Sequence, residues 1–278
     1  MNEPFSPNGE PRHGNSILRQ AQAWMACGAR LVLSEKSLWF GMTLVYFVFG
    51  FLLTLIPFMG HLLLILVSPM LIASVFWGRA QGTQGPPTPV MVQPVSFQGV
   101  FQAWIAQPAQ ELMRIFAQED KMFSAVLLGI VTLGLVVLVK IIGYLFIGGS
   151  MVAGLAAAQT GLTQITTLFG MLLVAGLSVL LAMGLLYSVP LTVLGNRQPL
   201  DAIAESFATC RENARTQLAL VLPFLIIALI IMVAFAKSVW LGYLLLVSVG
   251  FLALPLFIAA IYCSYRTLYP PEFPVSPK

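Results

Sequence analysis

Residues 218–236 read LALVLPFLIIALIIMVAFA and contain no charged side chain. A helix needs about 20 predominantly apolar residues to cross the hydrocarbon layer of a membrane, so this stretch predicts one membrane span. Comparable stretches predict five more spans, at residues 38–56, 61–77, 122–146, 168–194 and 239–265. The sequence therefore predicts an all-α fold, a polytopic membrane helix bundle of six transmembrane helices in three hairpins with interfacial amphipathic helices.

The composition of the whole chain agrees with this interpretation. Of its 278 residues, 59% are hydrophobic and only 9% are charged, whereas soluble domains carry about 25% charged residues. A bilayer removes the need for a polar surface, because surface that faces lipid is apolar. The net charge of +4 is attributed to orientation signals beside the spans, so we expect no nucleic-acid partner.

The distribution of Lys and Arg predicts the orientation. Basic residues precede the first span, lie between the second and third and between the fourth and fifth, and follow the sixth, whereas the opposite loops hold only Lys237. By the positive-inside rule, both termini are expected in the cytoplasm. No secretory signal peptide is expected, because residues 1–15 are polar and no apolar core follows a basic start.

The chain is predicted to consist of three hairpin units with tails and a linker. The less structured segments are a disordered cytoplasmic tail at 1–15, a Pro- and Gly-rich cytoplasmic linker at 78–96, and a C-terminal tail at 269–278. The hairpins with their preceding interfacial helices occupy residues 16–77, 97–194 and 195–268.

Each hairpin is preceded by an amphipathic stretch. Before the third hairpin, the predicted apolar stripe consists of Leu200, Ile203, Ala204, Phe207, Cys210 and Ala214. Helices of this kind lie in the membrane interface with the apolar side down, or they pack against the cytoplasmic ends of the bundle. Both interpretations are compatible with the sequence.

The return helix of each hairpin contains a proline, at Pro69, Pro190 and Pro255. Proline removes a backbone hydrogen bond and tends to kink a helix. The recurrence indicates either an ancient triplication or coincidence, because proline is ordinary in membrane helices. Residues 148–166 are also open to several interpretations: an outer loop, a re-entrant segment, or part of an extra span.

Groups that could perform chemistry are scarce. The predicted spans contain no Asp or Glu, and His13 and His61 lie in different environments, so no catalytic residue, metal site or cofactor is expected. Cys27, Cys210 and Cys263 are far apart and form no CxxC pair. We therefore expect three free thiols rather than a disulfide framework.

Three cations are candidate lipid or anion contacts. Lys140 is the one charge embedded in a predicted span; its long stem can snorkel to the headgroups, or it can hold an anionic headgroup or substrate together with Tyr144 one turn later. Arg211 and Arg215 are spaced to share one helix face and are predicted to bind lipid phosphates.

The same cytoplasmic helix carries the pattern Ser206-Phe207-x-x-Cys210-x-x-Asn213. With the hairpins around it, this pattern resembles a family of uncharacterised proteobacterial six-span inner-membrane proteins, distantly similar to the membrane domain attached to some glycerophosphodiester phosphodiesterases. The resemblance implies a multi-pass location in the bacterial cytoplasmic (inner) membrane and no established activity. No phosphodiesterase domain is recognised in the chain, so no catalytic residue is carried over.

Two functions remain open from the sequence. The first is a non-enzymatic scaffold or accessory, regulatory subunit that contacts membrane lipids and a membrane-protein partner or another copy of itself. The alternative is a small permease for an apolar or lipid-like solute, with the kinked return helices lining a path. An intramembrane enzyme is disfavoured by the lack of carboxylates and of paired catalytic groups in the spans.

Overall fold

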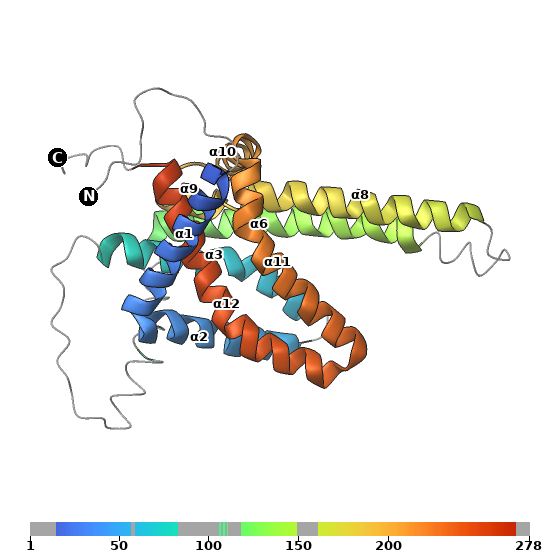
Figure 1. Ribbon diagram of the computed structural model, residues 1–278, viewed down its shortest axis with the longest axis horizontal. Helices are drawn as coiled ribbons and strands as arrows, with labels where there is room; N and C mark the ends of the chain where they lie inside the picture. Colours follow the sequence, from blue (N-terminus) through green and yellow to red (C-terminus); the bar gives the residue numbers. More distant parts are fainter. Residues whose placement is uncertain are drawn as a thin grey trace. The chain divides into compact units, whose positions relative to one another are not determined.

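The computed structural model describes residues 15–56, 59–82, 106, 108, 110, 118–148 and 161–270 (Figure 1). Within these residues the chain is helical and has no β-strand, which confirms the predicted all-α fold. The elements are α1 (Asn15–Ser34), α2 (Lys36–Thr54), α3 (Met59–Gly82), α6 (Glu119–Gly143), the π-helix η3 (Tyr144–Gly148), α8 (Gly161–Leu185), α9 (Ser188–Val193), α10 (Pro199–Glu212), α11 (Ala214–Lys237) and α12 (Val239–Leu268).

The predicted membrane spans are present as helices. Among the described residues, six segments are long and apolar enough to cross a membrane: Lys36–Leu53, Met59–Trp77, Asp120–Phe146, Thr167–Val193, Ala214–Lys237 and Val239–Leu268. Their ends differ from the predicted ends by only a few residues, as helix boundaries usually do. The chain is a multi-pass membrane protein.

Some expectations lie outside the described residues. These are the tail before residue 15, most of the linker at 78–96, the amphipathic stretch before the second hairpin apart from isolated positions, residues 149–160 within the open segment 148–166, and the tail beyond residue 270. At the linker's start, α3 continues past the predicted span to Gly82.

The described helices form two compact units. We call the first the terminal unit; it contains α1, α11 and α12. The second, the central unit, contains α2, α3, α6, η3, α8, α9 and α10. The helix that precedes the first hairpin in the sequence, α1, thus packs with the third hairpin.

In the terminal unit, α1 contacts both helices of the third hairpin. Its buried Ala21 and Trp24 pack against Leu220 of α11 and Ala260 of α12. The backbones come closest at Gly28, where a Cβ would lie 2.7 Å from the Ala260 backbone nitrogen. Membrane helices use small residues in this way to bring their backbones together. α1 is therefore packed against the third hairpin, and its place in the membrane interface stays a prediction.

In the central unit, α3 is the partner of both α2 and α6. The Tyr46 hydroxyl of α2 and the Ser68 hydroxyl of α3 are 3.1 Å apart and share a hydrogen bond. Gly129 of α6 lies directly against the backbone carbonyl of Leu66, in a place that any side chain would fill. α6 also packs against α8, and α10 packs against α8, α9 and α6.

The buried face of α10 differs from the predicted apolar stripe. It consists of Pro199, Ala202, Ser206 and Cys210, whereas Leu200 is 68% exposed. α8 comes close to α10 at Gly184, where a Cβ would lie 3.1 Å from the Ile203 Cγ2 atom. Small side chains thus face the protein interior here, as they do where membrane helices pack closely, and the orientation of the apolar stripe toward the membrane stays a prediction.

The three return-helix prolines are buried. Pro69 and Pro255 lie inside α3 and α12, and Pro190 lies in the first turn of the short helix α9. A further proline, Pro223, lies inside α11, the first helix of the third hairpin. Proline is thus not confined to the return helices, and the proposed triplication stays a prediction.

Candidate functional site

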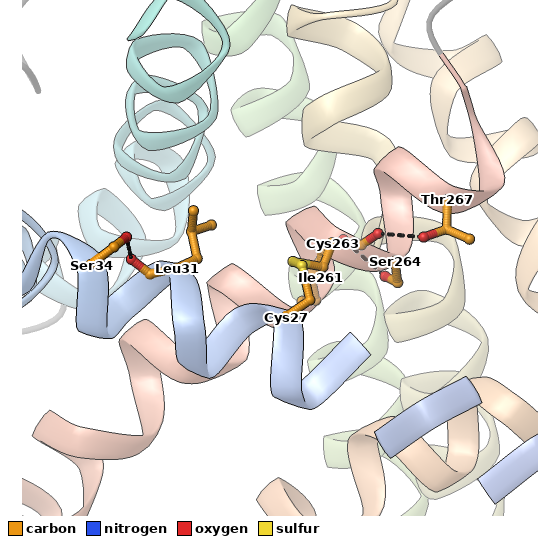
Figure 2. Close-up of a disulfide and its surroundings, with 7 residues drawn as sticks. All are labelled: Cys27, Leu31, Ser34, Ile261, Cys263, Ser264 and Thr267. Carbon is orange, nitrogen blue, oxygen red and sulfur yellow. Dashed lines mark hydrogen bonds between the residues drawn. A yellow bond between two sulfur atoms is a disulfide. The ribbon is translucent and has the colours of Figure 1, made fainter. Parts of the chain in front are cut away.

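Two of the three cysteines are joined in the terminal unit. Cys27 of α1 and Cys263 of α12 form a disulfide with an S–S distance of 2.04 Å and a Cα–Cα distance of 6.2 Å (Figure 2). The expectation of free thiols was therefore wrong for this pair. They are separated by 236 residues, and their pairing depends on the packing of α1 on α12, which spacing in the sequence does not reveal.

The two sulfur-bearing residues have different surroundings. Cys263 is 6% exposed, whereas Cys27 is exposed. Cys27 shares a helix face with Gln20, Arg30 and Ser34, which are all exposed. The disulfide therefore joins the polar side of α1 to the interior of the unit.

The backbone around this pair is well anchored. Thr267 Oγ1 donates a hydrogen bond to the Cys263 carbonyl at 2.9 Å, and Ser264 Oγ donates to the Ile261 carbonyl at 2.8 Å (Figure 2). Hydroxyls that bond to their own helix in this way need no other partner inside the membrane. On α1, Gly28 directly follows Cys27 and lies against the Ala260 backbone, so the two helices also pack closely beside the disulfide.

The third cysteine, Cys210, is a free thiol, as expected, and is 1% exposed in α10. Burial raises the pKa of Cys210 to about 11, because the thiolate would lose its hydration, and a side-chain hydrogen bond with Ser206 opposes part of that rise. At neutral pH the group is a protonated thiol and hence a poor nucleophile.

The central unit has a break in its fourth span, between α8 and α9. In a continuous helix the Tyr187 backbone N–H would bond to the Met183 carbonyl. Instead, it donates to Ser206 Oγ of α10 at 3.0 Å, and Ser206 donates its own proton to the Met183 carbonyl at 2.8 Å. A side chain inserted into the helical ladder is a recognised cause of a kink. Pro190 follows at a position in α9 where a missing N–H is tolerated.

Lys121, at the start of α6, contacts both α3 and the end of α9. Its Nζ donates to the Val193 carbonyl in the last turn of α9, at 2.8 Å, and to the Asn196 side chain. It also lies 5.2 Å from the centre of the Trp77 ring of α3, within the range of a cation–π interaction. A cation at a helix C-terminus satisfies free carbonyls and complements the helix dipole.

The three predicted lipid contacts are all among the described residues. Lys140 is exposed on α6, about 28 Å along the helix from Lys121 by the rise per residue, and Tyr144, one turn later, is 77% exposed. Arg211 and Arg215 are both exposed. Asn213 separates α10 from α11, so the two arginines belong to different helices rather than to one helix face.

Several hydroxyl groups described in the spans bond within their own helix. Those that donate to the carbonyl one turn earlier include Thr43, Ser68, Ser74, Ser178 and Ser248. Within the described part of the chain, no group of three or more His, Cys, Asp or Glu residues could hold a metal ion.

Comparisons of the chain with protein-family models, with curated proteins and with solved structures found no match. The resemblance suggested by the pattern around Ser206 and Cys210 therefore stays a prediction.

Sequence reasoning missed the three features that organise the described residues: the Cys27–Cys263 disulfide, the bridging hydroxyl of Ser206 and the cap formed by Lys121. Ser206 belongs to the quoted pattern of α10 and Pro190 predicts a kink, but nothing in the sequence indicates that they act at the same place. In the sequence, Lys121 is only one of the basic residues between the second and third spans.

Proposed function

We propose that this multi-pass protein is a non-enzymatic scaffold or accessory subunit of the bacterial cytoplasmic membrane. The observation that carries the proposal is the use of polar groups in the central unit. Ser206 and Lys121 each bond to backbone groups of neighbouring helices, and several span hydroxyls, such as those of Thr43 and Ser74, bond to their own helices. Groups used in this way stabilise a framework and are not presented to a substrate.

The proposed orientation places both termini in the cytoplasm. Its support is the contact of Lys121 with Val193 and Asn196, which brings the second-to-third and fourth-to-fifth connections to one end of the central unit, as the positive-inside rule requires. An alkaline phosphatase reporter, which is active only outside the cytoplasm, tests this. Fusion after Asn196 is expected to be inactive and fusion after Lys237 active, and the opposite pattern would overturn the orientation.

The scaffold proposal is tested by purifying the full chain from its native membrane in mild detergent and determining the mass and composition of the complex. We expect a partner in fixed stoichiometry or a defined self-assembly. Leu200, exposed on α10, is the first residue to replace: Leu200→Ala should weaken the complex, whereas Leu172→Ala, at an exposed position of the α8 span, should not. A monodisperse monomer without a partner would contradict the proposal.

The alternative, a small permease for an apolar or lipid-like solute, is supported by the break between α8 and α9, because discontinuous helices often mark transport sites. The Trp39 indole nitrogen and the Thr132 and Thr192 hydroxyls are also buried without a hydrogen-bond partner among the described residues. Vesicles containing the full chain would exchange a fluorescent lipid faster than empty vesicles. Lys140→Ala should slow that exchange and Lys237→Ala should not; rates equal to those of empty vesicles would exclude this function.

The candidate lipid contacts Lys140, Arg211 and Arg215 remain part of both proposals. Mass spectrometry of co-purified lipid tests them. Replacement of Arg211 and Arg215 by Gln should lower the retained anionic phospholipid, because each basic residue near a membrane surface contributes about 1 kcal/mol of attraction. Unchanged lipid content would remove the arginines from the site.

A further inference from the structure

The disulfide of the terminal unit has one accessible end and one shielded end. Cys27 lies on the exposed polar face of α1, and Cys263 is 6% exposed on α12. Thiol–disulfide exchange requires a thiolate to approach one sulfur, so accessibility decides which sulfur is attacked. An incoming thiol therefore meets Cys27 first.

The charge beside Cys27 favours one class of thiol. Arg30 is exposed one helical turn after Cys27, on the same face as Gln20 and Ser34. A cation at this spacing attracts an anionic thiol and stabilises the negative charge that develops on sulfur. At about 6 Å in water, a unit charge changes the local concentration of a monovalent anion roughly threefold.

We propose that Cys27 and Cys263 form a thiol-exchange site for small anionic thiols, of which glutathione is the chemical type. The thiolate attacks Cys27 Sγ, a new S–S bond forms between them, and the Cys27–Cys263 bond breaks. Cys263 leaves as a thiolate and takes a proton from water. A second thiolate attacks the sulfur of the first thiol, releases Cys27 as a thiolate, and departs as the oxidised small disulfide. The two small thiols thus supply the two electrons that reduce the protein disulfide.

The terminal unit retains contacts that do not depend on this bond. Trp24 packs against Leu220, and Gly28 packs against the Ala260 backbone. These contacts keep Cys263 beside Cys27 after reduction, so the same reaction can run in reverse with an oxidised small disulfide. In the proposed orientation both cysteines lie on the cytoplasmic side, where disulfides are mostly transient or redox-sensing. The cytoplasmic location of the two cysteines rests on the proposed orientation, whereas the exchange reaction itself does not.

The test uses the purified full chain in detergent, with oxidised glutathione as the probe and peptide mass spectrometry as the readout. Cys263→Ser leaves Cys27 free, and we expect a glutathione adduct on Cys27. Cys27→Ser leaves Cys263 free, and its adduct should form far more slowly because the residue is buried. Each variant is first shown to be monodisperse. Equal rates for the two variants, or no adduct on Cys27, would overturn the proposal.

The preference for anionic thiols has its own control. In the native chain, Arg30→Gln should slow reduction by glutathione roughly threefold at low salt and leave reduction by the neutral thiol 2-mercaptoethanol unchanged. Arg19→Gln, at another exposed position of α1, should affect neither reaction. If Arg30→Gln changes both reactions equally, or neither, the assigned substrate class is wrong. A pair that resists both thiols until the protein is denatured would exclude the exchange site itself.

Discussion

Tyr187 donates its backbone N–H to the hydroxyl of Ser206 at 3.0 Å, although the two residues belong to different helices. The same hydroxyl donates to the Met183 carbonyl at 2.8 Å. One backbone hydrogen bond of the fourth span is thereby replaced by two bonds to α10. A helix outside the spans is thus connected directly to the place where a span is interrupted.

Replacing Ser206 should therefore destabilise the central unit. Ser206→Ala leaves a buried N–H and a buried carbonyl without their partner, which costs about 1–3 kcal/mol. Thermal unfolding in detergent, followed by circular dichroism, measures the change. Ser178→Ala is the matched control, because that exposed hydroxyl bonds only to its own helix, and its effect should stay within about 0.5 kcal/mol. Equal effects of the two variants would show that the bridge contributes nothing to stability.

Gly129 and Gly134 provide a comparison within one helix. A Cβ at Gly129 meets the Leu66 backbone carbonyl, whereas a Cβ at Gly134 meets nothing within 4 Å. Gly129→Ala should cost at least about 1–3 kcal/mol by overpacking α3 against α6. Gly134→Ala should be neutral or stabilising by up to about 1 kcal/mol, because Ala favours a helix more than Gly. Thermal unfolding in detergent compares the two variants. If Gly134→Ala lost stability and Gly129→Ala did not, the described packing of α3 and α6 would be contradicted.

Lys121 and Lys140 lie on the same helix but have different environments. Lys121→Met removes the hydrogen bond to the Val193 carbonyl and the charge at the end of α9, with an expected cost of about 1–2 kcal/mol. Lys140→Met removes an exposed charge and should not destabilise the chain. Limited proteolysis near Asn196 gives a local readout, since release of the cap should speed cleavage there in the Lys121 variant. Equal cleavage in both variants would argue against the cap.

The pKa of Cys210 predicts a dependence on pH. The folded pKa of the thiol is about 11, above its ordinary value of 9.0, so folding favours the neutral thiol. Its contribution to stability is complete below pH 9 and is lost as the pH rises toward 11. The difference in unfolding temperature between the native chain and Cys210→Ala should therefore be smaller above pH 9 than below it. A constant difference across this range would show that the thiol does not titrate as burial requires.

The sequence predicts features that depend on a single segment, and it does not predict contacts between segments that are far apart in the chain. The span at residues 218–236 could be recognised because crossing a bilayer requires a long apolar helix, a requirement visible in a single segment. The partners of α1 could not be recognised, because Trp24 and Gly28 contact residues of α11 and α12 that are far away in the sequence. For α10, the sequence predicts an apolar stripe that includes Leu200 but does not show which residues pack against the protein; the small side chains of Ala202 and Ser206 are the buried ones. Pairings of distant residues such as Cys27 with Cys263 depend on the tertiary fold.

The composition of the terminal unit also sets an order of events during synthesis. Among the described helices, α1 leaves the ribosome before α12, with the contiguous residues of the central unit between them. The central unit can assemble while translation continues, as contiguous units generally do, but Trp24 meets Leu220 only once the fifth span has been made, and Gly28 meets the Ala260 backbone only once the sixth has. Closure of the terminal unit therefore reports that translation has reached α12, and the Cys27–Cys263 bond can form only on a chain that has reached that point.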